Sequence, residues 1–192
     1  MPELSIDPKT TALVLIDLQN GITRNPVAPH SAADVISNGA KLAEAWRAAG
    51  SVVVLVRVAF AADGSDRLKM PTDAQPPAMN MTPDWSDLVT EIGPKSGDLV
   101  ITKHQWGAFY GTELELQLER RGIRTIVIGG ISTNFGVEST ARDAFERAYA
   151  LVFVEDAMAS MSADAHTFAV KTIFPRLGLV RSTTDVLAAF GT

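Results

Sequence analysis

No cysteine occurs in this sequence, which excludes disulfide bridges, thiolate metal sites and a thiol nucleophile in a single observation. No apolar run approaches the roughly 20 residues that span a bilayer. The 17 basic residues form no cluster among the 22 acidic ones, so the electrostatic signature of nucleic-acid binding is also missing. We therefore expect neither a membrane nor a nucleic-acid partner.

The amino-terminal residues, Met1 to Ser5, lack the basic start and apolar run of a signal peptide. The absence of cysteine is compatible with a reducing compartment. Both features favour a cytoplasmic location.

The 192 residues, of which 46% are hydrophobic, suit one globular domain over residues 1–192 that buries its own core. No internal repeat or linker divides the chain. No cofactor is needed to explain its folding, and we expect none.

Six short apolar runs, rich in Val, Ile and Leu, predict the strands of a parallel sheet that is covered on both faces. Segments with helical spacing lie between them, and this alternation predicts a three-layer α/β/α domain with right-handed crossovers. The predicted strands are Thr11 to Asp17, Ser51 to Val58, Leu99 to Lys103, Thr125 to Gly130, Leu151 to Glu155 and Gly178 to Arg181, and the predicted helices are Ala33 to Ala49, Thr112 to Arg121, Val137 to Ala148, Ala163 to Phe174 and Asp185 to Phe190.

One long segment, Ala61 to Pro94, breaks this rhythm with five prolines and several polar residues around Trp85. A loop of this length in a compact domain is usually functional or poorly ordered. We expect it to lie beside the functional site or at a subunit contact, where Trp85 would offer apolar surface.

Ligands of open parallel sheets bind at the carboxyl ends of the strands, so we expect the functional site at these ends. The first strand ends at Asp17, a carboxylate that is unfavourable to bury unless it is paired or functional. The third strand ends at Lys103, whose charge complements Asp17. The alternatives are a turn cap for Asp17 and a solvated strand end for Lys103.

The fourth strand runs into a polar turn, Ser132 to Gly136, that is followed at once by a helix. The first backbone N–H groups of a helix can bind a carboxylate or a developing oxyanion. The alternative is an ordinary connection in which a Ser or Thr side chain caps the helix. That alternative does not explain why the turn coincides with Asp17 and Lys103 at equivalent strand ends.

Several neighbours of these strand ends are candidates for substrate contacts. Arg57 suits a substrate carboxylate, a surface ion pair being the alternative reading. Phe60, Trp106 and Phe135 are candidates for the wall of an apolar pocket, although aromatic residues near strand ends are more often part of the core. The full set of candidates is Gln19, Arg57, Phe60, Trp106, Ser132, Thr133, Asn134 and Phe135.

Taken in order, these segments resemble the isochorismatase-like hydrolase family, which also holds nicotinamidases and other amidases. The resemblance implies a doubly wound six-stranded parallel sheet in the order 3-2-1-4-5-6, a small-molecule substrate, and a homodimer or homotetramer. It rests on the segments Ala12 to Asn20, Lys103 with Trp106 to Leu114, Gly130 to Val137, Thr140 to Ala144 and Glu155 to Ala157.

Most members of that family have a catalytic triad of Asp, Lys and Cys, whose positions fall here on Asp17, Lys103 and Gly136. Without sulfur, the route through an acyl-enzyme on cysteine is closed. Neither Ser132 nor Ser139 replaces the cysteine by position.

The isochorismatases proper carry glycine at this position, and they cleave a vinyl ether and release pyruvate. The implied roles are a proton from Asp17 to the vinyl carbon, orientation by Lys103, and binding of a polar substrate group by backbone N–H groups near Gly136. The resemblance is incomplete in the turn, where Ser132 to Asn134 replace an alanine-histidine pair.

Some questions stay open at this stage. Burial raises the pKa of Asp17 and Lys103 lowers it, and the sequence does not say which effect is larger. Gly136 either leaves room for substrate or permits a backbone conformation that other residues disfavour. The alternatives to acid catalysis are an inactive binding or scaffold protein and hydrolysis by a water that Asp17 activates.

The metal site of the nicotinamidases, an Asp with histidines after the second strand, has no counterpart here. The second strand is followed by Ala59 and Phe60, and the chain has only 3 histidines. The sequence therefore predicts no catalytic metal.

Overall fold

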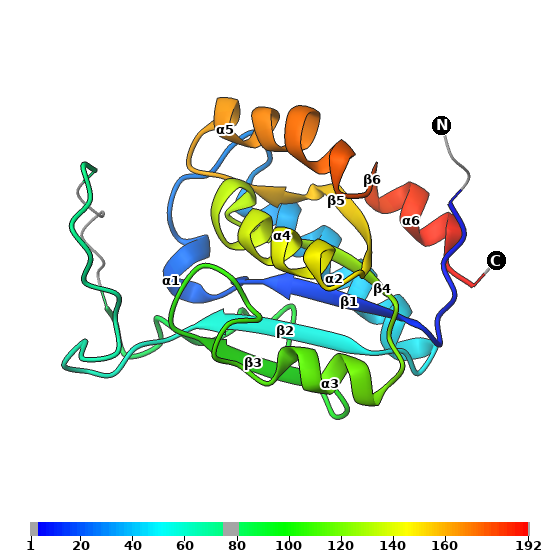
Figure 1. Ribbon diagram of the computed structural model, residues 1–192, viewed down its shortest axis with the longest axis horizontal. Helices are drawn as coiled ribbons and strands as arrows, with labels where there is room; N and C mark the ends of the chain where they lie inside the picture. Colours follow the sequence, from blue (N-terminus) through cyan, green and yellow to red (C-terminus); the bar gives the residue numbers. More distant parts are fainter. Residues whose placement is uncertain (1–3, 75–80, 192) are drawn as a thin grey trace.

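The computed structural model describes residues 4–74 and 81–191 and contains one sheet of six parallel strands. The strand order is β3-β2-β1-β4-β5-β6, which confirms the fold expected from the resemblance (Figure 1). The strands are β1 (Thr11–Ile16), β2 (Val53–Val58), β3 (Leu99–Lys103), β4 (Thr125–Ile131), β5 (Ala150–Ala159) and β6 (Leu179–Arg181).

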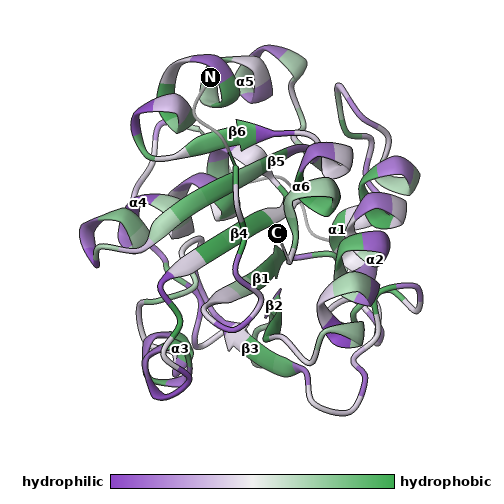
Figure 2. Cartoon of the chain, turned by 90° about the vertical axis from the view of Figure 1, so that its right-hand side faces the viewer, coloured by the Kyte–Doolittle hydropathy of each residue, from purple (hydrophilic) through white to green (hydrophobic). Residues whose placement is uncertain are grey.

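Helices cover both faces of this sheet, as the unbroken apolar strands require. One buried cluster joins α2 (Ala32–Ala48) and α6 (Thr183–Ala189) to the sheet, and the other joins α3 (Leu114–Arg120), α4 (Glu138–Glu146) and the segment from α5 (Ala163–Phe168) through η2 (Ala169–Ile173) to η3 (Phe174–Arg176). Figure 2 shows the apolar strands between these two helical layers. Within the described ranges, no helix is long and apolar enough to cross a membrane.

Several boundaries differ from the predicted ones. β5 continues to Ala159 instead of ending at Glu155, because its register with β4 shifts between Ile128 and Gly130 and pairing then resumes. α6 begins at Thr183, earlier than predicted, because Ser182 and Asp185 form a capping box. A short helix, α1 (Asn20–Thr23), was not predicted, and the predicted helix Ala163 to Phe174 is divided among α5, η2 and η3.

The described residues that directly follow β2 project from the body at the carboxyl end of that strand (Figure 1). Residues 75–80, which include Pro76 and Pro77, lie outside the described residues. The expectation that Trp85 offers apolar surface is wrong, because its side chain is buried with 4% exposure. Its ring lies so close to Gly21 that a Cβ there would be 2.1 Å from the ring carbon Cδ1. The exposed large apolar residues in the described part of this segment are instead Leu68, Met70 and Met81.

The carboxyl ends of β1 and β4 approach each other closely at Gly130. This glycine has φ of 123°, and a Cβ here would lie 2.1 Å from the carbonyl oxygen of Ile16. Only glycine allows this approach, which brings the turn after β4 against the end of β1. The fold thus places the two predicted halves of the site together.

Candidate active site

Asp17 and Lys103 form a buried ion pair at the carboxyl ends of β1 and β3. The Nζ atom of Lys103 lies 2.8 Å from Oδ2 of Asp17, and the two side chains are only 1% and 8% exposed, respectively. Lys103 also donates a hydrogen bond to the carbonyl oxygen of Trp106 at 2.6 Å. Asp17 has φ of 54°, a conformation that is uncommon outside glycine and concentrates at functional sites.

Burial decides the protonation of Asp17. It raises the pKa of this carboxyl to about 6, although the charge and hydrogen bond of Lys103 lower it. The second carboxyl oxygen, Oδ1, is buried and accepts no hydrogen bond from the described residues. Asp17 is therefore a carboxyl group that can hold or release a proton near neutral pH, with one oxygen free to face a ligand.

Gly136 lies directly beside this pair. A Cβ at this position would be 3.1 Å from Oδ2 of Asp17 and 3.2 Å from Nζ of Lys103. It would also be 2.9 Å from a methyl carbon of Ile16, which is closer than Cβ atoms normally approach. Because the φ angle of Gly136 is not in the left-handed region, backbone strain does not require glycine here. Glycine is needed here for a different reason: the side chains of Asp17, Lys103 and Ile16 close in on this position, and the missing side chain lets them approach the turn.

The turn that carries Gly136 is a π-helical turn, η1 (Thr133–Val137), which continues into α4. Such turns are rare and occur often at functional sites. The alternative of an ordinary capped helix is wrong, because the side chain of Ser132 makes no capping hydrogen bond and its hydroxyl is buried without a partner among the described residues. Ser132 follows a cis peptide bond with Ile131.

A residue that the sequence did not single out, Thr140, connects this turn to the loop after β3. Its hydroxyl donates to the carbonyl oxygen of Gly136 at 2.7 Å and accepts from the backbone N–H of Ala108 at 3.1 Å. Thr140 therefore holds Gly136 in place relative to Trp106 and Lys103, which lie on the same loop and the strand before it.

Three of the predicted substrate contacts are engaged inside the protein. The fully buried side chain of Gln19 donates to the carbonyl oxygens of Val58 and Trp85 and accepts from the N–H of Val58. Thr133 Oγ1 is bonded to Nδ1 of His166 at 2.8 Å, and Asn134 Oδ1 accepts from the hydroxyl of Ser160 at 2.5 Å. This geometry favours structural roles for these side chains over the predicted substrate contacts.

The predicted aromatic wall is divided. The rings of Trp106 and Phe135 lie 4.9 Å apart between centroids, beside the pair, and remain 62% and 40% exposed. Phe60 instead packs near Trp85, at 6.2 Å between ring centroids, and the guanidinium carbon of Arg67 lies over the Phe60 ring, 4.7 Å from its centroid. Trp106 and Phe135 are thus the two aromatic candidates that the structure brings to the Asp17–Lys103 pair.

Arg57 lies on the opposite face of the sheet from Lys103. Arg57 is in register with Thr102, and Val58 is in register with Lys103. Since successive side chains of a strand point to opposite faces, Arg57 and Lys103 diverge. The Nε atom of Arg57 donates to the hydroxyl of Thr102 at 3.1 Å, which favours a structural role.

Comparisons with known proteins identify the family to which the chain is similar. Residues 11–185 match the family described as the Isochorismatase domain. The chain is 50% identical, over 97% of its own length and 99% of the other, to an uncharacterized isochorismatase family protein, YecD, of Escherichia coli O157:H7. It is 49% identical to an isochorismatase family protein of Burkholderia thailandensis, whose structure superimposes with a TM-score of 0.94 over 100% of both chains. N-carbamoylsarcosine amidase of Thermoplasma acidophilum is 29% identical, with a TM-score of 0.72 over 91% of this chain and 96% of that one.

Proposed function

Because the chain belongs to the isochorismatase family of hydrolases, we propose that it cleaves a small vinyl ether by acid catalysis from Asp17, without a covalent intermediate. The observation that carries this proposal is the state of the Asp17 carboxyl. It is buried with a pKa of about 6 and has one unpartnered oxygen. Where the family resemblance places a catalytic cysteine, this chain has Gly136, which lies beside the carboxyl.

The proposed reaction begins with transfer of a proton from Asp17 to the terminal vinyl carbon, which leaves an oxocarbenium ion. Water adds to that cation and returns a proton to the carboxylate of Asp17. The resulting hemiketal then loses the alcohol and forms a ketone. Lys103 orients the carboxyl through Oδ2 and stabilises the carboxylate that the first proton transfer leaves behind.

The exposed edge of the site suits a small substrate with a planar or cyclic part. Trp106 and Phe135 present aromatic surface near the turn that carries Gly136. The hydroxyl of Ser132 is a free polar atom on the same turn. We propose that these three residues, rather than Gln19 or Arg57, make the substrate contacts.

A pH–rate profile tests this assignment. If Asp17 is the acid, kcat/KM for a vinyl ether falls as pH rises through about 6, because the ionised carboxyl has no proton to donate. A water activated by Asp17 as base would give the opposite slope, with activity rising through the same pH. An inactive binding protein would turn over none of the vinyl ethers, esters and amides in a substrate panel.

The variant Lys103→Met sharpens this test. Removing the cation removes its charge and its hydrogen bond, which both lower the pKa of Asp17. The pH at which kcat/KM begins to fall is therefore expected to move upward. Methionine keeps much of the volume of the buried lysine stem. If kcat/KM of the variant fell at the same pH as that of the wild type, a group other than Asp17 would be responsible for the pH dependence.

We also propose that the protein is a cytoplasmic homodimer or homotetramer. Leu68, Met70 and Tyr110 are each more than 70% exposed, and we propose that they contact a partner subunit. Light scattering at micromolar concentration is expected to give a multiple of 20.5 kDa. A single species of 20.5 kDa would contradict this assignment.

A further inference from the structure

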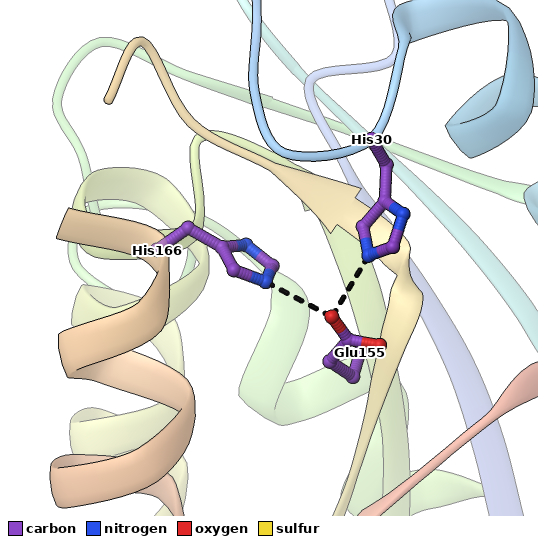
Figure 3. A group of neighbouring side chains, drawn as sticks. All are labelled: His30, Glu155 and His166. Carbon is purple, nitrogen blue, oxygen red and sulfur yellow. Dashed lines mark hydrogen bonds and ion pairs between the residues drawn. The ribbon is translucent and has the colours of Figure 1, made fainter. Parts of the chain in front are cut away.

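A second group of polar side chains lies beside the turn, apart from the Asp17–Lys103 pair. His30, from the segment before α2, and His166, from α5, both point Nε2 at one oxygen of Glu155 on β5 (Figure 3). The distances to Oε1 of Glu155 are 2.8 Å and 3.2 Å. The three ligand atoms lie within 4.8 Å of one another. Neither the proposed reaction nor the predicted site uses these residues.

We propose that His30, Glu155 and His166 bind one divalent transition-metal ion of the zinc class. Two imidazole nitrogens and one carboxylate oxygen are a ligand set that such ions favour, with water completing the coordination. A hard ion such as Mg²⁺ or Ca²⁺ prefers oxygen ligands and fits this set poorly. The proposal does not depend on the reaction proposed above.

The surroundings of His166 support metal binding. Nδ1 of His166 is bonded to the hydroxyl of Thr133 at 2.8 Å, and metal-ligating histidines usually have such a partner on their other nitrogen. In the tautomer that carries its proton on Nδ1, His166 donates a hydrogen bond to this hydroxyl, and the lone pair of Nε2 points at Glu155. A cation stabilises this arrangement, whereas a lone pair facing a carboxylate oxygen is repelled.

The three ligands are held in place and can be reached from solvent. Ala28 and Ser160 exchange two backbone hydrogen bonds, of 2.7 Å and 2.8 Å, which fix the segment of His30 against the end of β5. The His30 and Glu155 side chains are 30% and 34% exposed, while that of His166 is 2% exposed. An ion can therefore enter from one side and keep water ligands on that side.

The position of this ion indicates its role. Through His166 it would act on Thr133, which begins η1, the turn that carries Gly136. It would also join three segments that are far apart in the sequence: the loop before α2, strand β5 and helix α5. We infer a metal that holds the turn in position and does not touch the substrate, so that the prediction of no catalytic metal is unaffected.

The experiment titrates untagged, chelator-treated protein with Zn²⁺ in competition with a chromophoric chelator. One equivalent is expected to bind, and Co²⁺ is expected to give the visible absorption of a low-coordinate site. Thr133→Val should lower the affinity about 10- to 100-fold, as the loss of an outer partner does, and His30→Ala should lower it further. Glu155→Gln provides a second ligand variant should His30→Ala fail to fold.

His104 offers the matched control, because it is the remaining histidine of the chain and lies elsewhere, bonded to the carbonyl oxygen of Ala59. His104→Ala is expected to bind Zn²⁺ like the wild type. The proposal fails if no saturable binding is seen, or if His30→Ala, Glu155→Gln and His104→Ala all bind Zn²⁺ with the same affinity.

Discussion

Replacing Asp17 by asparagine is expected to lower turnover of a vinyl ether at least about 100-fold while the protein stays folded. Asparagine keeps the shape of the side chain and an oxygen that can accept from Lys103 at the position of Oδ2. It has no acidic proton to give to a vinyl carbon. The measurement is kcat/KM of the variant near pH 5, where the wild-type carboxyl, with its pKa of about 6, is mostly protonated.

The matched control for this variant is Asp34→Asn, which changes an exposed carboxylate at the start of α2 in the same way. It should retain wild-type turnover. If Asp17→Asn were as active as Asp34→Asn, the assignment of Asp17 as the acid would be wrong. Circular dichroism of both variants separates loss of chemistry from loss of fold.

The unfolding free energies of the wild type and of Asp17→Asn report the pKa of Asp17 in the folded protein. Because folding raises this pKa from 3.8 to about 6, the protonated carboxyl favours the folded state, and that contribution is lost as pH rises through about 6. At about 1.4 kcal/mol per pKa unit, the full effect is about 3 kcal/mol. The free energy of unfolding of the wild type, minus that of Asp17→Asn, should therefore fall by at most about 3 kcal/mol from pH 4 to pH 7.

The positions of Asp17, Lys103 and Gly136 could be predicted from the sequence because parallel strands end at a common edge of the sheet. Three residues at three such ends must lie near one another once the strand order is known. The apolar runs predict the positions of the strands, because a strand that is buried on both faces contains few polar residues. The same reasoning could not place side chains beyond the strand ends.

Gln19 and Arg57 illustrate that limit. Gln19 follows a strand end, as a ligand-binding residue would, yet its amide is bonded to the backbone of Val58 and Trp85. Those partners come from distant segments that no local pattern reveals. Arg57 was assigned to the site without regard to the alternation of side chains, which places it across the sheet from Lys103.

The protonation of Asp17 and the group around Glu155 could not be predicted either. The pKa depends on how completely the folded chain excludes water, and the sequence alone does not give that balance. His30 and Glu155 are separated by 125 residues, so only the tertiary fold brings them together.

Adding a thiol at Gly136 is expected to abolish most of the vinyl-ether activity, by roughly 100-fold or more, because misplacing groups by about 1 Å has effects of this size. A Cβ at this position would lie 2.9 Å from Ile16 and 3.1 Å from the Asp17 carboxyl, so the substituent pushes the carboxyl out of its position. Gly136→Ala is the matched variant, since it adds the Cβ without the sulfur. Equal losses of activity in both variants would assign the effect to crowding by the added Cβ and not to the sulfur.

The chain without cysteine makes the chemistry of Gly136→Cys unambiguous, because every thiol reaction of the variant comes from this one position. The activity of the wild type should be indifferent to iodoacetamide, whereas the variant should be alkylated at a rate that rises with pH as the thiolate forms. We do not expect the added sulfur alone to make the variant hydrolyse an amide, because we propose that the rest of the site binds a vinyl ether. Full vinyl-ether activity in Gly136→Cys would show that substrate does not bind beside Asp17. Efficient amide cleavage by the wild type through a trapped acyl intermediate would falsify the mechanism without a covalent nucleophile.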